Sequence, residues 1–376
     1  MVFRPAPESS RADLFRAFNY HRAMTSLPTP NLTRIGWRGR FPELTEGRVL
    51  ARVSAQHRAG YELHDGVHEF NAQPAPHFLK RNFDPGQRPA VGDFVIVAPG
   101  APPHILEVLP RRGALTRAAA GERYARQIIA TNIDVVFVLM GLDTDFNPAR
   151  AERYLALIEG SQALPVVVLT KADKVDAGDV QEALAGLAER LPNGTPLHAI
   201  NSKDAESVSV LEAWLKPGTT AVLVGSSGAG KSTLTNTLLG EARMATAATR
   251  ASDGRGRHTT THRALLMLPG GACLIDTPGM RELKLTGEEN LEVFADIDAL
   301  AAQCRFADCA HGNEPGCAVR TALQSGELDS DRYRHFLKLR GEQESQAALI
   351  EQRMRRDEGR SPSPRQRQLY RDRDRK

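Results

Sequence analysis

A glycine-rich segment in the second half of the chain has the residue types of a phosphate-binding loop. Residues 225–233 read GSSGAGKST, with Gly225, Gly230, Lys231 and Ser232 at the required spacing between an apolar run and a potential helix start. The glycines can turn successive N–H groups toward phosphate oxygens, and a helix N-terminus favours negative charge. We expect Lys231 to reach the β- and γ-phosphates of a nucleotide and Ser232 to hold Mg²⁺. A chance Gly/Ser-rich turn would not need strand, spacing and helix together. The predicted contacts are Gly225, Ser226, Ser227, Gly228, Ala229, Gly230, Lys231, Ser232 and Thr233.

A second motif, which contains an acidic residue, follows about 45 residues after this loop. Asp276-Thr277-Pro278-Gly279 ends an apolar run, so Asp276 can bind Mg²⁺ and the Gly279 N–H can meet the γ-phosphate. Between the two motifs lies the polar segment 254–262, GRGRHTTTH. A threonine in such a segment can complete the Mg²⁺ shell when a γ-phosphate is bound.

Selectivity for a base is predicted from Thr170-Lys171-Ala172-Asp173, at the end of another apolar run. The Asp173 carboxylate can accept two hydrogen bonds from guanine, which adenine cannot donate, and the Lys171 stem can lie over the base. An ordinary strand-end loop is the alternative, because K-x-D alone is a weak pattern. This motif precedes the phosphate loop by about 55 residues, the reverse of the usual order, which indicates a circularly permuted domain.

Three cysteines and one histidine crowd into fourteen residues near the C-terminus. Cys304, Cys309, His311 and Cys317 form a Cys₃His set suited to a closed structural Zn²⁺ site. Three unrelated reduced cysteines are the alternative. Cys273, in an apolar run, is more typical of a small core residue.

These residues must be positioned by at least two kinds of structure. Five short segments with period-two alternation, at 47–55, 61–65, 68–72, 93–98 and 104–109, predict a small β-barrel, with an OB-fold as the leading candidate. From about residue 126, buried apolar runs alternate with helical segments at 149–164, 178–191 and 208–215, which predicts an α/β domain with a mostly parallel sheet. A helix is expected to start at Ser232, and the chain is helical from about 289.

Composition limits the classes of function. The 376 residues carry a net charge of +4, but residues 353–376 hold ten basic and four acidic residues. Such a tail can contact nucleic acid or can simply be a solvated end. No apolar run approaches 18 residues and no signal core is visible, so we expect a soluble cytoplasmic protein without a membrane span.

Together these motifs resemble the ribosome small-subunit-dependent GTPase A family, the circularly permuted YjeQ (RsgA) GTPases. The resemblance covers residues 40–340 and includes VGDFV at 91–95, VLPR at 108–111, IATNID at 129–134 and GRHTTT at 256–261. It implies an OB-fold, a permuted GTPase domain and a C-terminal zinc-binding domain. It also implies a late assembly factor that binds the small ribosomal subunit and its rRNA, and whose GTP hydrolysis the subunit stimulates.

The resemblance also assigns roles to single residues. It implies that His258 serves hydrolysis and that Thr260, or the adjacent Thr259, faces Mg²⁺ together with Ser232 and Asp276. Cys304, Cys309, His311 and Cys317 match the zinc ligands. Thr170 departs from the family, which usually has Asn there, so the link between base loop and phosphate loop is expected to weaken. Asn201-Ser202-Lys203 stands about where the fifth GTPase motif belongs.

The expected domains are an N-terminal extension (1–39), the OB-fold barrel (40–116), the permuted GTPase domain (117–288), a helical zinc-binding domain (289–352) and a basic, disordered tail (353–376). We expect a monomer that binds GTP and GDP. No Gln follows Gly279, since Met280, Arg281 and Glu282 stand there, which predicts slow intrinsic turnover. Two other functions stay open: an RNA-binding module that holds nucleotide passively, and an ATP-dependent phosphotransferase, against which Asp173 argues.

Overall fold

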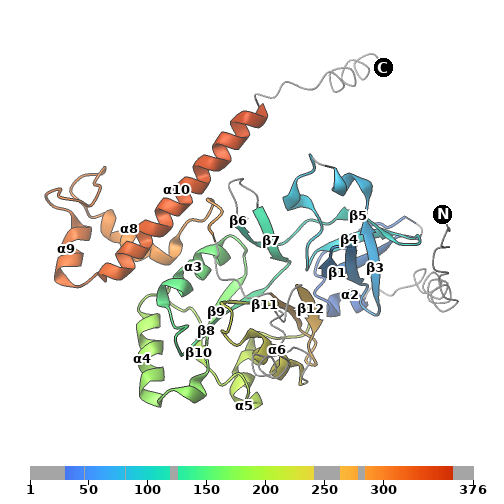
Figure 1. Cartoon of the computed structure of the whole chain (residues 1–376), viewed down its shortest axis with the longest axis horizontal. Coiled ribbons are helices and arrows are strands. Elements are labelled where there is room, and N and C mark those ends of the chain that lie inside the picture. Colours follow the sequence, from blue (N-terminus) through green and yellow to red (C-terminus); the bar gives the residue numbers. More distant parts are fainter. Residues whose placement is uncertain are drawn as a thin grey trace, which may run out of the picture. The chain divides into compact units, whose positions relative to one another are not determined.

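The computed structural model describes residues 30–45, 47–80, 82–118, 126–240, 263–277 and 284–358 (Figure 1). The chain separates into two compact units. The first contains the residues up to Arg117 together with Gln127–Leu283, and the second contains Ala118–Arg126 together with the residues from Lys284 onward. None of the helices in these ranges combines the length and apolar content needed to cross a bilayer.

The first unit begins with a five-stranded β-barrel. Antiparallel pairs join β1 to β2, β2 to β3, β4 to β5 and β1 to β4, and a parallel pair between β3 and β5 closes the ring. Alternate residues of β2 and β3 are buried, as the period-two pattern predicts. The closed order is that of an OB-fold, so this prediction is confirmed. The strands are β1 (Val49–His57), β2 (Gly60–His64), β3 (Glu69–Pro74), β4 (Phe94–Ala98) and β5 (His104–Val108).

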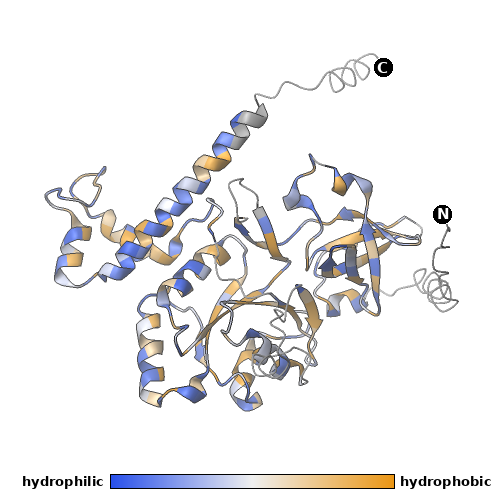
Figure 2. Cartoon of the chain, in the orientation of Figure 1, coloured by the Kyte–Doolittle hydropathy of each residue, from blue (hydrophilic) through white to orange (hydrophobic). Residues whose placement is uncertain are grey.

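A six-stranded portion of the same sheet forms the α/β part of the unit. Its order is β10-β9-β8-β11-β13-β12, and every pair is parallel except that of β12 with β13. Figure 2 shows the central strands as largely hydrophobic, and all residues of β8 and β11 are buried. The strands are β8 (Val135–Gly141), β9 (Leu164–Thr170), β10 (Leu197–Ala199), β11 (Thr220–Gly225), β12 (Ala264–Met267) and β13 (Cys273–Asp276).

The order of these strands is that of a circularly permuted domain. The strand that leads into the glycine-rich loop, β11, lies between β8 and β13, although β8 and β9 come earlier in the chain. Helix α6 packs on β11 and β13, and α3 packs on β8 and β9. The helices of this part are α3 (Pro148–Glu159), α4 (Ala177–Ala188), α5 (Ala205–Val208) and α6 (Lys231–Leu239), with short 3-10 turns η3 (Ala172–Lys174) and η4 (Ser209–Ala213).

Two helix predictions need correction. Helix α3 ends at Glu159 rather than at 164, because a turn must bring Leu164 back into register with Val135 of β8. The segment expected as a helix over 208–215 starts earlier, at Ala205, where the Asp204 side chain accepts hydrogen bonds from two backbone N–H groups. Its second half is a 3-10 turn. The small sheet of β6 (Ala114–Ala118) and β7 (Arg126–Thr131) was not anticipated.

The second unit is helical in its described part. It contains η5 (Glu292–Phe294), α8 (Ala295–Ala301), α9 (Ala318–Ser325) and α10 (Ser330–Glu358). Phe294, Ile297, Val319 and Leu339 form its buried apolar centre. The buried Arg332 guanidinium lies over the Phe294 ring, 5.1 Å from the ring centre, and pairs with Asp296 at 2.8 Å.

One buried arginine connects the barrel to the α/β sheet inside the first unit. The Arg52 side chain is fully buried in β1 and donates to the carbonyl oxygens of Ile35, Gly92 and Asn132, at 2.5, 3.1 and 3.2 Å. It also donates to Thr220 Oγ1, at the first residue of β11, at 2.9 Å. Ile35 follows the short helix α2 (Pro30–Arg34). Burial lowers the pKa of Arg52, and the ring of acceptors compensates the buried charge.

Replacement of Arg52 by Met should destabilise the first unit strongly. The substitution leaves several buried acceptors without a donor, so the free energy of unfolding should fall by about 3 kcal/mol. Urea denaturation followed by circular dichroism measures this change. Arg48→Met, at an exposed arginine one residue before β1, serves as the control and should change stability by less than about 0.5 kcal/mol. Equal effects of the two substitutions would contradict the role given to Arg52.

Candidate functional site

Four parallel strands end at one edge of the sheet and bring the predicted nucleotide motifs together. Gly225, the last residue of β11, pairs with Leu139 of β8, and Thr170, the last residue of β9, pairs with Gly141. Asp276, the last residue of β13, pairs with Leu223. The glycine-rich loop, the base loop and the acidic residue therefore start from adjacent strand ends, where ligands of open α/β sheets bind.

Positive φ angles require glycine in the glycine-rich loop, as Gly225 and Gly230 show. Gly225 has a φ of +152°, and a Cβ there would lie 2.5 Å from the Leu139 carbonyl oxygen. Gly230 has a φ of +90° and stands directly before the first residue of α6. The loop thus leaves β11 close beside β8 and leads into a helix N-terminus, the arrangement that cradles phosphate groups.

Lys231 is held inward by its own loop. Its Nζ donates to the carbonyl oxygens of Gly225 and Ser226, at 2.9 and 2.6 Å. Burial lowers the pKa of Lys231 to about 8, while the nearby carboxylates of Asp276 and Asp145 act in the opposite direction. A buried ammonium that forms no direct ion pair within the described residues is suited to bind a phosphate.

Asp276 has the environment of a carboxylate prepared for a cation. Its side chain is buried, and neither carboxylate oxygen accepts a well-formed hydrogen bond in the described part of the chain. Burial raises the pKa of Asp276 to about 6, although Lys231 and the Thr277 backbone favour the ionised form. An unsatisfied buried carboxylate beside the first turn of α6, which carries Ser232, fits a Mg²⁺ ion held directly or through water.

Thr170 links the base loop to the phosphate loop despite its departure from Asn. Its side chain is buried, and its Oγ1 donates to the Ala229 carbonyl oxygen at 2.9 Å. The Thr170 Oγ1 also lies 3.3 Å from the position that a Cβ on Gly230 would take. A hydroxyl therefore makes the connection that we expected the substitution to weaken.

The base loop continues from this contact with the two groups predicted to meet the base, Lys171 and Asp173. Lys171 has a left-handed backbone conformation, with a φ of 64°, and its Nζ lies 2.6 Å from Asp143 Oδ2. Asp173 lies in η3 and is exposed. The segment Asn201–Lys203 follows β10 at the same edge of the sheet, and the carbonyl of its Ser202 accepts a hydrogen bond from Thr237 of α6 at 2.7 Å.

Sequence analysis missed two acidic residues in the loop between β8 and α3. Asp143 contacts Lys171, as above, and Asp145 accepts a hydrogen bond from Ser226 Oγ at 2.6 Å. A signal was present in the sequence, because two carboxylates directly follow a fully buried strand. His258, Thr259, Thr260 and Gly279 lie outside the described residues, as do most of residues 1–39 and of the basic tail.

The Cys/His cluster of the second unit has the geometry of a metal site. Cys304 Sγ lies 3.5 Å from His311 Nδ1 and 3.9 Å from Cys317 Sγ, and Cys317 Sγ lies 3.6 Å from His311 Nδ1. Cys309 supplies the fourth potential ligand atom, and all four atoms lie within 4.8 Å of one another. Zinc–ligand lengths of about 2.0 to 2.3 Å in a tetrahedron place ligand atoms about 3.3 to 3.8 Å apart, so the set fits one zinc ion.

The backbone around the cluster is built for this convergence. His311 has a φ of 60°, and Gly316 has a φ of +77° with its carbonyl oxygen accepting from the Arg305 N–H at 3.1 Å. Cys317 is the N-cap residue of α9, and its Sγ accepts from the Arg320 N–H at 3.4 Å. Such N–H donors stabilise a thiolate, the form that binds metal.

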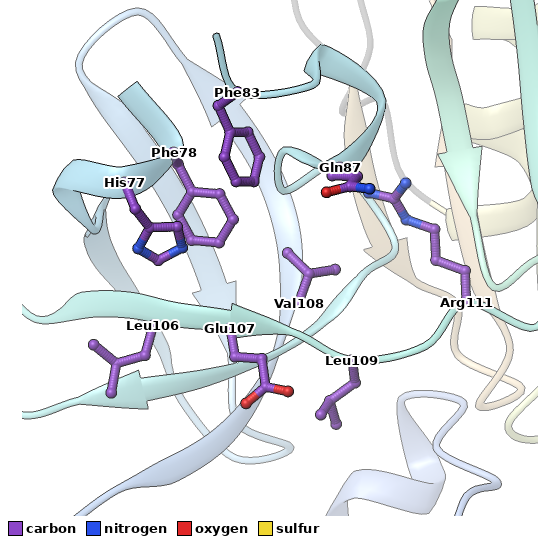
Figure 3. Close-up of a pocket in the computed structure, with 9 residues that line it drawn as sticks. All are labelled: His77, Phe78, Phe83, Gln87, Leu106, Glu107, Val108, Leu109 and Arg111. Carbon is purple, nitrogen blue, oxygen red and sulfur yellow. The ribbon is translucent and has the colours of Figure 1, made fainter. Parts of the chain in front are cut away.

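A second candidate site lies on the barrel, in the connection between β3 and β4 and along β5. A cavity of about 340 Å³ is lined there by the rings of His77, Phe78 and Phe83 and by the polar side chains of Gln87 and Glu107 (Figure 3). The Phe78 and Phe83 ring centres are 5.2 Å apart in an edge-to-face arrangement. The 3-10 turn η1 (Pro76–Leu79) carries His77 and Phe78, and η2 (Pro85–Gln87) carries Gln87, with Phe83 two residues before it.

Comparison with known proteins places the chain in a family. The sequence profile of the RsgA GTPase family matches residues 108–286. A protein from Xanthomonas axonopodis pv. citri (strain 306), named small ribosomal subunit biogenesis GTPase RsgA, is 52% identical over 343 residues, which are 88% of this chain and 93% of that relative. The chain belongs to the RsgA GTPase family, a family of GTP hydrolases. The resemblance inferred from the motifs is thus confirmed.

Two solved structures share the fold of this family member. The crystal structure of YjeQ from Thermotoga maritima matches with a TM-score of 0.56 and 25% identity, over 78% of this chain and 97% of that one. The structure of YloQ, described as a circularly permuted GTPase, matches with a TM-score of 0.54 and 23% identity, over 79% of this chain and 96% of that one. The permuted order deduced from the motifs and observed in the sheet is therefore shared.

Thr170→Val should weaken nucleotide binding although the two side chains have the same shape. Valine cannot donate to Ala229, so the dissociation constants of GDP and of a non-hydrolysable GTP analogue should rise by about five- to tenfold. Fluorescence titration with labelled nucleotides measures both constants. Thr170→Ser keeps the hydroxyl and should stay within about twofold of wild type, and if Val and Ser variants bind alike, the hydroxyl link is unimportant.

The purified chain should contain about one zinc ion, bound by the Cys/His cluster. Cys309→Ser should lose the metal, as measured by elemental analysis, and should lower the unfolding temperature of the second unit, because metal binding contributes directly to folding in small metal sites. Cys273→Ala, at a buried cysteine of β13 in the first unit, is the control and should retain the zinc. Retention of full metal content by Cys309→Ser would contradict the assignment.

Proposed function

We propose that this chain is a late assembly factor of the small ribosomal subunit, and that contact with the subunit stimulates its GTP hydrolysis. The observation that carries the proposal is the extent of similarity to a named small ribosomal subunit biogenesis GTPase, 52% identity over 88% of the chain. This similarity reaches well beyond the GTPase segment at 108–286, so parts outside the nucleotide site are shared as well.

The nucleotide site supports a division of roles among its residues. In this proposal Lys231 exchanges the carbonyl oxygens of Gly225 and Ser226 for the β- and γ-phosphates, and the loop N–H groups bind the remaining phosphate oxygens. Asp173 selects guanine, with Lys171 over the base. Ser232 and Asp276 hold Mg²⁺, which neutralises phosphate charge when bound, together with Thr260. Gly279 contacts the γ-phosphate, and His258 orients the attacking water.

The parts outside the nucleotide site support contact with RNA. OB-fold barrels commonly bind oligonucleotides, and the partly exposed rings of His77 and Phe83 in the cavity offer aromatic surface of the kind on which unpaired bases stack. We propose that the barrel and the zinc-binding unit contact rRNA of the small subunit, and that the protein acts as a monomer in the cytoplasm. The domain boundaries at 39, 116, 288 and 352 remain part of this proposal.

Two alternative functions give different outcomes in one experiment. GTP and ATP hydrolysis are measured with no ribosomal particles, with purified small subunits and with purified large subunits. We expect small subunits, but not large subunits, to raise the rate of GTP hydrolysis by about 100-fold or more, as activating partners do for GTPases. Neither particle should change the rate of ATP hydrolysis. An RNA-binding module that holds nucleotide passively would bind GTP without stimulated hydrolysis. Preferential hydrolysis of ATP would favour a phosphotransferase.

His258→Ala tests the proposed catalytic residue in the same assay. Water-orienting groups contribute about 10²-fold or more, so the stimulated rate should fall by about that factor. The dissociation constant for a non-hydrolysable GTP analogue, and co-sedimentation with small subunits at moderate salt, should be unchanged. Equal losses in binding and hydrolysis would refute the assignment of His258, and absence of co-sedimentation by wild type would refute the assembly role.

A further inference from the structure

The loop between β8 and α3 touches both halves of the nucleotide site. It comprises residues 142–147, LDTDFN, and none of the nucleotide motifs includes it. The Asp143 Oδ2 lies 2.6 Å from Lys171 Nζ, in the base loop. The two carboxylate oxygens of Asp145 both lie 2.6 Å from Ser226 Oγ, in the phosphate loop. Two carboxylates only two residues apart thus bind two segments that are separated by more than fifty positions in the chain.

The 142–147 loop is itself held firmly. The Asp145 N–H donates to Asp143 Oδ1 at 3.1 Å, and the Phe146 N–H donates to the Asp143 carbonyl oxygen at 2.9 Å. The next residue, Asn147, caps α3 by accepting from the Arg150 N–H at 3.2 Å. Arg150 in turn forms an ion pair with the Asp145 carboxylate. The carboxylates therefore start from an anchored backbone, and the Asp145 side chain is mostly buried, with 15% of it exposed.

The end of β8 leaves room for these contacts. Gly141 is the last residue of the strand, and its N–H donates to Asp145 Oδ2 at 3.3 Å. A Cβ on Gly141 would lie 2.6 Å from Asp143 Oδ1 and 3.0 Å from Lys171 Nζ. The ion pair of Asp143 with Lys171 thus depends on the absence of a side chain at Gly141, which makes the contact part of the folded site rather than an incidental surface pair.

We propose that Asp143 and Asp145 are positioning residues that hold the base loop and the phosphate loop in the arrangement that binds the nucleotide. Asp143 directs the Lys171 stem, and Asp145 directs Ser226 and with it the N–H groups of the phosphate loop. Ordering both loops before the ligand arrives lowers the entropic cost of binding. The inference rests on the proposed roles of Lys171 and of residues 225–233.

The arrangement predicts which nucleotide states should respond. Both loops contact groups that GTP and GDP share. Loss of either carboxylate should therefore weaken the binding of the two nucleotides by the same factor. A charge effect would act differently. If the acidic groups mainly repelled the phosphates, their removal would tighten binding, and more strongly for GTP than for GDP.

The test measures dissociation constants of GDP and of a non-hydrolysable GTP analogue for the full chain. Asp145→Ala should raise both by about tenfold, whereas Asp145→Asn retains an oxygen that accepts from Ser226 and should stay within about threefold. Ser226→Ala should also raise both constants, and its addition to Asp145→Ala should weaken binding no further, because the contact between the two side chains is already lost in the Asp145 variant. Asp143→Ala should raise both constants about fivefold.

A matched control variant separates positioning from folding. Asp179→Ala removes an exposed carboxylate from α4 of the same unit and should bind nucleotide as wild type does. Two results together cannot arise from general destabilisation. One is the recovery of nucleotide affinity in Asp145→Asn, and the other is the absence of an additive effect on the dissociation constants in the double variant. If Asp145→Ala does not fold, Ser226→Ala and Asp143→Ala carry the same test.

The inference would be overturned by wild-type or tighter binding in Asp143→Ala and Asp145→Ala, or by additive effects of Asp145→Ala and Ser226→Ala. Failure of the wild-type chain to bind guanine nucleotides would instead refute the proposed nucleotide site.

Discussion

The register of four parallel strands is the constraint on which the nucleotide site depends. Main-chain hydrogen bonds join β9 to β8, β8 to β11 and β11 to β13, so the ends of these strands lie side by side. Because side chains alternate along a strand, a shift of one residue in any pair would turn the terminal residues to the opposite face. Fully buried apolar residues along β8 and β11 make such a shift costly. The polar site at the strand ends is thus maintained by the apolar strands behind it.

Buried charges at this edge are arranged so that a nucleotide and its cation complete them. Burial shifts the pKa of Lys231 downward to about 8 and that of Asp276 upward to about 6, so both groups move toward their neutral forms. Each lies near the other, and Lys231 satisfies its donors with carbonyl oxygens of its own loop. A phosphate group would supply negative charge to Lys231, and a divalent cation would supply positive charge to Asp276. The protein alone provides these opposite charges only in part.

Separate physical solutions stabilise the two units. In the first, the fully buried Arg52 of β1 donates to Thr220 at the start of β11. It also donates to carbonyl oxygens in three further segments of the chain. In the second, a modest apolar centre around Phe294 and Leu339 is accompanied by a cluster of four ligand-type side chains. Small units of this kind often need a metal, because their surface is large relative to their core.

Local pattern was sufficient to predict the elements and the chemistry of the motifs. Period-two alternation located the five barrel strands, continuous apolar runs located β8, β9 and β11, and the order of TKAD before GSSGAGKST indicated the permutation. These features depend on burial of neighbouring residues and on short spacings, which a sequence displays directly. The tertiary structure decided which distant residues meet: Thr170 with Ala229, 59 positions apart, Asp145 with Ser226, 81 apart, and Arg52 with Thr220, 168 apart. Such contacts depend on strand order and register, and no periodicity in a single sequence specifies them.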